Sequence, residues 1–157
     1  MGLDENKDLI RRCFNELLNE KNLKALDKYC AENFRDHNPA AGVDQGGIAA
    51  AREGFERLFR GLPDVQGKIE DIYAEGDRVF VRSIYTGTHE GDLMGLRPSW
   101  KPLRMEVWHL FRVEDGKIAD HRAQSDSLML LRQVAASPKQ MAEVILIPPR
   151  DVPTTQA

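Results

Sequence analysis

Few cysteines and no long hydrophobic run are present in this sequence, and each absence excludes a class of protein. Two cysteines among 157 residues are too few for a disulfide framework, so we expect a reducing compartment, the cytoplasm. The apolar run Val144–Ile147 is far shorter than the roughly 20 residues of a membrane span, so we expect no membrane association. The opening letters MGLDENKDLIRR lack a basic head followed by an apolar stretch, so no secretory signal is expected.

Excess positive charge is also absent. Lys and Arg together number 22 against 25 Asp and Glu, which gives a formal net charge of −3. Without a basic block, sequence-independent binding to nucleic acid is not expected. The sequence also lacks a phosphate-binding loop, a Gly-x-Gly-x-x-Gly, a Gly-x-Ser-x-Gly and a His-Glu-x-x-His motif, so it carries none of these cofactor or catalytic motifs.

Apolar residues recur at helical spacing in three segments of the first part of the chain. They predict an amphipathic helix over residues 5–19, a short helix that begins after Asn22, and a third helix from Ile48. The letters DHNPAAGVDQGG between the second and third helices indicate a loop. Cys13 and Cys30 fall on the apolar stripes of the first two helices, so we interpret both as buried core residues and not as nucleophiles.

Beyond Val65 the apolar residues alternate in twos, which predicts strands. Four strands follow one another through short connections and read GKIEDIYAE, RVFVRSIYTGTHE, LRMEVWHLFR and KIADHRAQ. Asp126 then caps a short helix, SLMLLRQV. Helices followed by antiparallel strands indicate an α+β fold and not a parallel α/β sheet. We assign residues 1–136 to one domain and residues 137–157 to a C-terminal tail, whose apolar letters VILI could pack on the body or on a second subunit.

Two histidines stand out on the last two predicted strands. Alternation places His109 on the same apolar face as Met105, and it places His121 among small residues on the next strand. Because a tight turn joins these strands, they are antiparallel neighbours, and the two imidazoles face the same concave surface. Such a pair indicates either a polar reaction centre or two satisfied, partly buried side chains. No third ligand stands at a characteristic spacing, so a metal site is not expected.

Other polar residues lie near the predicted positions of these histidines. Asp126 follows the strand of His121, where its carboxylate either caps the last helix or serves as an orienting group or general base. His37 and Asn38 lie in the predicted loop, where residues are commonly solvated. Tyr85 on the second strand either directs its hydroxyl into the same cavity or belongs to the core.

Four segments carry a resemblance to a known family. In chain order they read DHNP, YTGTHEGDLMGLRPS, EVWHLFRVEDGKI and DHRAQSD, and the similarity spans about residues 5–135. Their order and spacing resemble those of the SnoaL-like polyketide cyclases, also called ester cyclases, in the NTF2-like superfamily. The resemblance implies a cone in which helices pack on a strongly curved antiparallel sheet and enclose an apolar pocket. It also implies a homodimer or homotetramer formed through the convex sheet face, and no cofactor.

The characterised cyclases of this family close a ring by an intramolecular aldol reaction, and the resemblance implies which residues act here. The two pocket histidines of the family match His109 and His121, and a second family aspartate matches Asp126. A polar family position in the loop matches Asn38. The catalytic aspartate of the aldol cyclases falls two residues after the second histidine, where this chain has Ala123.

We therefore expect an enzyme that acts on a hydrophobic, aromatic or polyketide-like small molecule, with His109, His121 and Asp126 as catalytic residues. The predicted substrate-binding residues are His37, Asn38, Tyr85, Met105 and, as a lid in the loop, Trp100. Ala123 leaves open a second hypothesis, a polyketide hydroxylase on the same scaffold. A third is a binding protein for an apolar ligand without turnover. A protein-interaction module is favoured least, because it leaves the inward histidines without a role.

Overall fold

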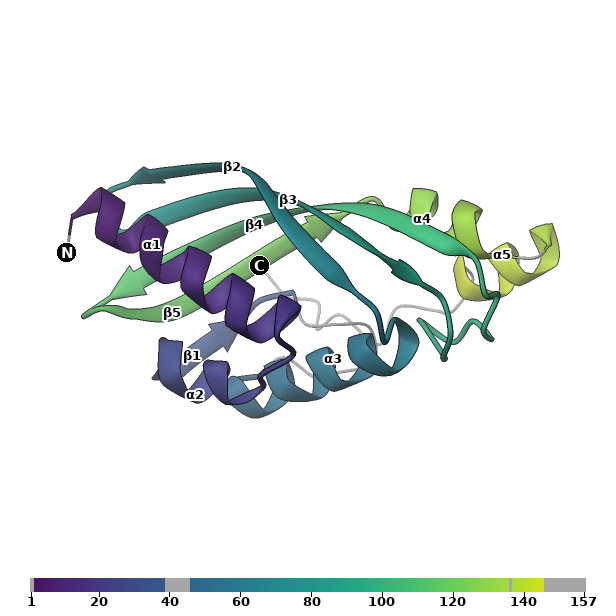
Figure 1. The fold of residues 1–157 in the computed structure, drawn as a ribbon, viewed down its shortest axis with the longest axis horizontal. Helices are drawn as coiled ribbons and strands as arrows, with labels where there is room; N and C mark the ends of the chain where they lie inside the picture. Colours follow the sequence, from purple (N-terminus) through teal and green to yellow (C-terminus); the bar gives the residue numbers. More distant parts are fainter. Residues whose placement is uncertain (1, 39–45, 136, 146–157) are drawn as a thin grey trace, which may run out of the picture.

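The computed structural model describes residues 2–38, 46–135 and 137–145. One sheet of five strands runs through the molecule in the order β1-β5-β4-β3-β2, and α1, α2 and α3 lie along one side of it (Figure 1). The helices are α1 (Leu3–Phe14), continued by the π-helical turn η1 (Asn15–Asn19), α2 (Lys24–Tyr29), α3 (Ile48–Gly61), α4 (Ser127–Val134) and α5 (Pro138–Ile145). The strands are β1 (Cys30–Asp36), β2 (Gln66–Glu75), β3 (Arg78–Thr88), β4 (Pro102–Glu114) and β5 (Lys117–Ser125). The predicted α+β class is confirmed.

The first helix forms where the sequence predicts it, because its apolar residues repeat at helical spacing. Leu9, Ile10 and Cys13 are buried, and the acidic first turn and basic last turn suit the helix dipole. The continuation of this helix packs closely on the sheet. A Cβ added to Gly67 of β2 would lie only 2.2 Å from Cδ2 of Leu18. Glycine at this position therefore allows the helix to approach the sheet.

The structure corrects the prediction in one respect, because the sheet has five strands and not four. The additional strand, β1, follows α2 directly and pairs in parallel with β5, with Asp36 opposite His121. Its register shifts between Cys30 and Arg35, and its buried residues Cys30 and Phe34 are four positions apart. The segment therefore lacks the alternation by which a strand is recognised. The other four strands form the predicted antiparallel meander.

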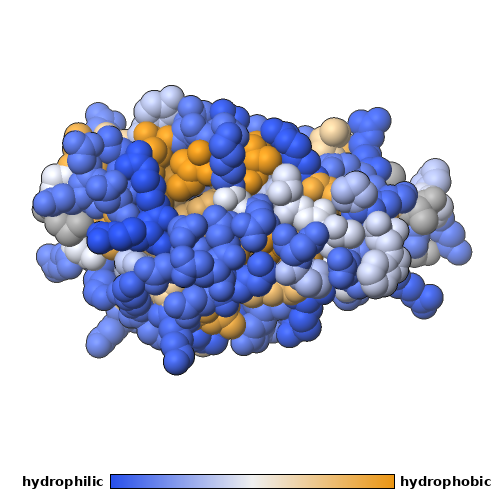
Figure 2. Space-filling view, viewed as in Figure 1, coloured by the Kyte–Doolittle hydropathy of each residue, from blue (hydrophilic) through white to orange (hydrophobic). Residues whose placement is uncertain are grey.

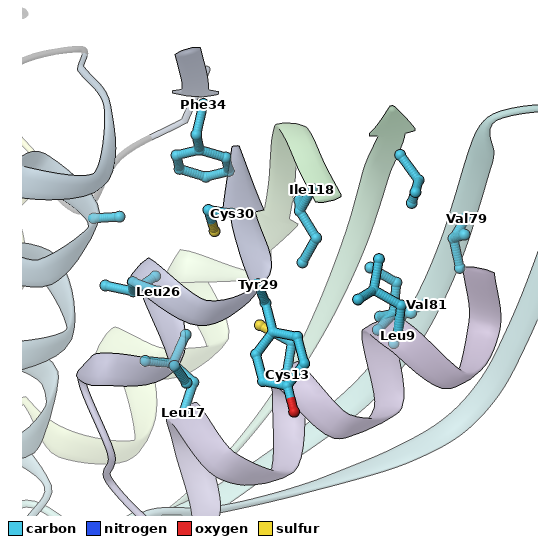
Figure 3. Packing of buried hydrophobic residues seen from close by; sticks show 14 residues of the cluster. Leu9, Cys13, Leu17, Leu26, Tyr29, Cys30, Phe34, Val79, Val81 and Ile118 are labelled. Atoms are coloured by element: carbon cyan, nitrogen blue, oxygen red, sulfur yellow. The ribbon is translucent and has the colours of Figure 1, made fainter. Parts of the chain in front are cut away.

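Two clusters of buried hydrophobic residues fill the space between the helices and the sheet. Figure 3 shows Cys13 and Cys30 in the first cluster, among the side chains of α1, α2 and β1. Both cysteines are free and buried, which confirms the prediction of core residues, but Cys30 is the first residue of β1 and does not lie on the predicted second helix. Burial raises the pKa of the Cys30 thiol to about 12, so this thiol stays protonated at neutral pH. The second cluster surrounds Tyr85 and includes Leu96 and Leu130.

The C-terminal part begins with the predicted cap. The carboxylate of Asp126 accepts a hydrogen bond from the backbone N–H of Met129 at 3.0 Å, at the start of α4. The helix α5 lies within the predicted tail 137–157, of which residues 137–145 are described. The side chains of the apolar run VILI lie outside the described residues, and the domain boundary at residue 136 stays a prediction. In the described part of the chain, no helix has both the length and the apolar character of a membrane span.

Candidate functional site

The candidate site lies on the inward face of the sheet, and its position follows from the alternation of β4. Leu103, Val107 and His109 are buried, whereas Arg104 and Trp108 on the other phase are exposed. The side chain of His109 is therefore directed inwards, and only 6 % of this residue is accessible to solvent. The predicted phase of this strand is confirmed.

The two histidines of neighbouring strands touch. Nδ1 of His109 lies 3.0 Å from Nε2 of His121, and their rings are stacked with centroids 5.3 Å apart. They are diagonal neighbours, since His109 pairs with Ala123 and His121 pairs with Phe111. The ring of Phe111 also stacks on both imidazoles. The strands thus bring together the two histidines that the sequence placed on one face.

A carboxylate from the edge strand completes the outer end of this pair. Oδ1 of Asp36 lies 3.2 Å from Nδ1 of His121 and accepts a hydrogen bond from the backbone N–H of Asn38 at 3.1 Å. Burial opposes ionisation of Asp36. The hydrogen bond from His121, the electrostatic attraction to that imidazole and the N–H of Asn38 outweigh this effect and hold the pKa of the carboxyl below its ordinary value. Asp36 is therefore an ionised group at neutral pH.

Two hydroxyl groups of β3 face the inner end of the pair. Nε2 of His109 lies 3.2 Å from Oγ of Ser83 and 3.4 Å from the hydroxyl of Tyr85. Burial raises the pKa of Tyr85, so the phenol stays protonated. Burial, and then the neighbouring imidazole of His121, hold the pKa of His109 well below its ordinary value. We call Asp36, His121, His109 and Tyr85 the histidine array.

The remaining loop residues of the prediction lie beside the array. Nε2 of His37 is 2.7 Å from Oδ1 of Asp120, a carboxylate that also binds Arg112. The side-chain oxygen of Asn38 accepts a hydrogen bond from the backbone N–H of Ala123 at 3.3 Å. His37 and Asn38 therefore link the chain at the end of β1 to β5 by hydrogen bonds. Their contact with a substrate stays a prediction.

Comparison with known families decides which fold family this arrangement represents. The model of the family described as SnoaL-like polyketide cyclase matches residues 8–134. The chain belongs to the SnoaL-like polyketide cyclase family.

Relatives of this SnoaL-like chain include enzymes and solved structures from Streptomyces. The nogalonic acid methyl ester cyclase of Streptomyces nogalater is 34 % identical over 114 residues, which cover 69 % of this chain and 82 % of the relative. The aklanonic acid methyl ester cyclase DauD of Streptomyces sp. (strain C5) is 31 % identical over 112 residues, or 69 % of this chain and 66 % of the relative. The structure of TsrD from Streptomyces laurentii superposes with a TM-score of 0.78 at 26 % identity and covers 87 % of this chain and 99 % of that one. The predicted NTF2-like fold is confirmed, with a mixed sheet in place of an entirely antiparallel one.

The SnoaL-like chain differs from the aldol cyclase pattern at one central position. Ala123 lies directly opposite His109 in the ladder between β4 and β5. Its methyl group stands where the resemblance places a catalytic carboxylate. The carboxylate that touches the histidines here is that of Asp36, which comes from another strand.

The other predicted site residues occupy different surroundings. Asp126 is exposed, and its carboxylate caps α4. The indole of Trp100 lies in the loop before β4, and 68 % of this residue is exposed. Met105 points inwards but is only partly buried, and it packs against the second cluster beside Tyr85. A lid role for Trp100 and substrate contact for Met105 stay predictions.

Asp36, Asp120 and Ser83 are site residues that the sequence did not single out. Asp36 ends a strand whose irregular burial hides it, and it was read only as the first residue of a loop. The partner of Asp120 is His37, which follows the end of that unrecognised strand, so no partner of Asp120 is visible in the sequence. The adjacent letters Asp-His in both segments, at 36–37 and 120–121, were the available signal.

Two inward residues beside the array are only partly buried. They are Met105 and Ala123, whereas Tyr85 between the helices and the sheet is buried. Figure 2 shows that hydrophilic residues cover most of the viewed face and that hydrophobic residues are exposed chiefly in its upper half. Two cavities of about 510 and 550 Å³ lie elsewhere, and neither His109 nor His121 lines them. Among the described residues, no three His, Cys, Asp or Glu side chains are grouped to hold a metal ion.

Proposed function

We propose that this protein is a cyclase that closes a ring on a hydrophobic, aromatic or polyketide-type ester by acid–base chemistry of its own side chains. The observation that carries the proposal is the contact between His109 and His121 on the inward face, with Asp36 bonded to the second imidazole. Two relatives at 31–34 % identity are named as cyclases of methyl esters, which supports this reaction class.

An intramolecular aldol closure needs a base and an acid at one place. The base removes a proton from a carbon next to a carbonyl, the enolate carbon attacks a second carbonyl of the same molecule, and the alkoxide that forms takes a proton. A neutral imidazole accepts a proton on one nitrogen and donates one from the other, so His109 and His121 together supply both functions. The apolar surroundings strengthen hydrogen bonds to the developing oxyanion.

The orienting role belongs to Asp36 in this proposal and not to Asp126. Asp36 makes the hydrogen bond to His121 that an orienting carboxylate requires, whereas Asp126 is exposed and caps a helix. Tyr85 and Met105 contribute to the surface that holds the substrate, and Asn38 borders it, whereas His37 pairs with Asp120 on the opposite face of the sheet. No metal ion and no organic cofactor takes part in the proposed reaction.

A second candidate function rests on Ala123. The base expected in an aldol cyclase is missing at this position, opposite His109. A hydroxylase of polyketide rings on the same scaffold does not need that carboxylate. The two reactions differ in the origin of the product oxygen, since only hydroxylation takes an oxygen atom from dioxygen.

The proposed assembly is a homodimer, or a pair of dimers, formed through the convex face of the sheet. Tyr73, Phe80 and Trp108 form an aromatic row across three strands, with ring centroids 6.5 and 5.7 Å apart. Tyr73 is 63 % exposed and Trp108 is 51 % exposed. An exposed apolar patch of this kind suits contact with a second copy of the chain.

The decisive experiment is a turnover assay with aklanonic acid methyl ester and nogalonic acid methyl ester under ¹⁸O₂. Cyclisation yields a product of unchanged mass, which chromatography separates from the substrate. The variants His109→Gln and His121→Gln should each lower kcat at least about 100-fold, because each removes a proton-transfer group. Asp8→Asn on the outer surface of α1, where Asp8 pairs with Arg11, is the control and should keep full activity.

Other outcomes of this assay contradict the proposal in different ways. A product that carries ¹⁸O identifies the hydroxylase. Saturable binding of the esters without any turnover identifies a binding protein. Full activity in both histidine variants would remove the histidine pair from the mechanism, whatever the reaction is.

A further inference from the structure

The direction of hydrogen bonding through the histidine array follows from the charge at its outer end. The ionised carboxylate of Asp36 only accepts hydrogen bonds, so Nδ1 of His121 carries a proton. In the neutral form of His121 the lone pair then lies on Nε2, which faces Nδ1 of His109 at 3.0 Å. Nδ1 of His109 is therefore protonated as well. Both imidazoles adopt the same tautomer for the same reason.

The same reasoning identifies the one hydroxyl group that donates a hydrogen bond to Nε2 of His109. The lone pair of His109 lies on Nε2, which faces the hydroxyl groups of Ser83 and Tyr85. Ser83 donates its single hydroxyl proton to the carbonyl of Val107 at 3.0 Å. Tyr85 therefore donates to His109. Every donor in the array points from Tyr85 toward Asp36.

We propose that Asp36 is a positioning residue that fixes both histidine tautomers, so that the array carries a proton from Tyr85 at its inner end to His121 at its outer end. For the reaction, this inference rests on the function proposed above, whereas the tautomers do not depend on any substrate. Asp36 acts through His121 and does not touch the reacting atoms. Tyr85 is the member of the array that meets the substrate.

The surroundings of the two ends agree with this assignment. Tyr85 belongs to the second apolar cluster, beside the partly covered Met105 and Ala123. The outer end lies at the edge of the sheet, where the side chains of His121 and Asp36 are 17 % and 11 % exposed. The array thus connects the apolar region that suits a hydrophobic substrate with a polar edge that can hold charge.

In the proposed transfer, the protons move in the following order. The C–H bond of the substrate breaks, its electron pair stays on the substrate as the enolate, and the oxygen of Tyr85 takes the proton. The original proton of Tyr85 passes to Nε2 of His109, and the Nδ1 proton of His109 passes to Nε2 of His121. His121 ends as an imidazolium beside the carboxylate of Asp36. The reverse sequence returns the proton to the alkoxide after ring closure.

The tautomers are measured by two-bond ¹H–¹⁵N correlation spectra of the full chain with ¹⁵N-labelled histidine. The four histidines are assigned by single changes to glutamine. We expect Nδ1–H for both His109 and His121. In Asp36→Leu, which removes the acceptor, both residues should change to Nε2–H. The matched control Asp120→Leu removes the neighbouring carboxylate, which binds His37, and should leave both tautomers unchanged.

Three results would overturn the inference. Nε2–H tautomers in the wild-type protein contradict it directly, and this measurement needs no variant to fold. Unchanged tautomers in a folded Asp36→Leu variant would show that Asp36 does not fix them. A wild-type kcat in that variant would remove its positioning role, because we expect kcat to fall at least about 100-fold while KM changes by less than about threefold.

The same data separate this inference from the function on which it rests. Expected tautomers in a protein that turns over none of the esters would contradict the proposed cyclase and leave the tautomer assignment intact. Turnover by a wild-type protein with Nε2–H tautomers would contradict the directed array alone.

Discussion

Nε2 of His37 lies 2.7 Å from Oδ1 of Asp120, and these two residues are the chain neighbours of Asp36 and His121, which form the other contact between these segments. Consecutive side chains of a strand point to opposite faces, so two Asp–His pairs fasten β1 to β5, one on each face of the sheet. This edge strand has an irregular register and pairs with one neighbour only. The two polar pairs therefore hold the end of β1 that carries Asp36.

Asp120→Asn should destabilise the protein in a pH-dependent manner. The hydrogen bond from His37, with the nearby Arg112, holds the pKa of Asp120 below its ordinary value of 3.8. A lowered carboxyl pKa contributes stability that is complete above this value and is lost as the pH falls through the lower folded-state pKa. At pH 7 the free energy of unfolding of the variant, measured by urea denaturation, should be lower than that of the wild type by about 1 kcal/mol or less, because the site is partly exposed.

The difference should shrink as the pH is lowered below 3.8, since the wild-type carboxyl then becomes protonated as well. Asp8→Asn, which breaks an exposed helix pair, is the control and should change the midpoint little at any pH. A difference between wild type and Asp120→Asn that stays constant down to about pH 2 would contradict this account.

Tyr85→Phe tests the inner end of the array. The change removes the hydroxyl that faces Nε2 of His109 at 3.4 Å and keeps the ring in the apolar cluster. We expect kcat to fall about 10–100-fold, because one proton-transfer step is lost. The free energy of unfolding should change by only about 1 kcal/mol, the usual net contribution of one hydrogen bond.

Tyr29→Phe is the matched control for this measurement. Its hydroxyl bonds Glu16 between two helices, away from the array, so kcat should stay at the wild-type value. Equal activity in the two variants would mean that Tyr85 serves packing alone.

The sequence predicted most of the fold because most elements show an undisturbed apolar period. The α1 stripe and the alternation of β2 to β5 were read directly, and the phase of His109 followed from that alternation. β1 was missed, because residues 30–36 bury Cys30 and Phe34 four positions apart and are otherwise largely polar. A strand without alternation has no local signature, and only its pairing with β5 reveals it.

The failure to recognise β1 also explains which residues of the candidate site the sequence predicts and which it does not. His109 and His121 were placed together because a short turn joins their strands. Asp36 could not be placed, because its contact with His121 joins residues 85 positions apart through the unrecognised strand. The sequence therefore points to Asp126 as the orienting carboxylate, because it is the next acid after His121 along the chain.

Gly67→Ala tests the close approach of helix and sheet. Its new methyl group would lie 2.2 Å from Cδ2 of Leu18 and 2.7 Å from Cζ of Phe14. Such overpacking should lower the free energy of unfolding by about 1–3 kcal/mol, measured by urea denaturation.

A double-mutant cycle identifies the cause of this loss. Leu18→Ala alone should cost about 2–5 kcal/mol, since Leu18 is buried. In the double variant the truncated side chain makes room for the methyl group that replaces a hydrogen atom of Gly67, so the combined cost should be smaller than the sum. Strict additivity would place the damage elsewhere.

Trp108→Ala tests the proposed dimer. Removing this half-exposed indole from the aromatic row should shift the protein toward the monomer, as measured by light scattering during size-exclusion chromatography. Trp100→Ala is the matched control, because Trp100 is the more exposed of the two indoles and lies in the loop before β4. If Trp100→Ala dissociates into monomers and Trp108→Ala remains a dimer, the interface lies on the loop before β4 instead.

The parallel pairing of β1 with β5 also determines when the candidate site can form during synthesis of the chain. The carboxylate of Asp36 emerges from the ribosome 85 residues before the imidazole of His121 that it holds. Every other strand of the sheet must be synthesised before the two can meet, since β5 is the last strand in the chain. A translation product that ends before β5 therefore contains Asp36 without His121, and the proposed acid–base site forms only when the sheet is complete.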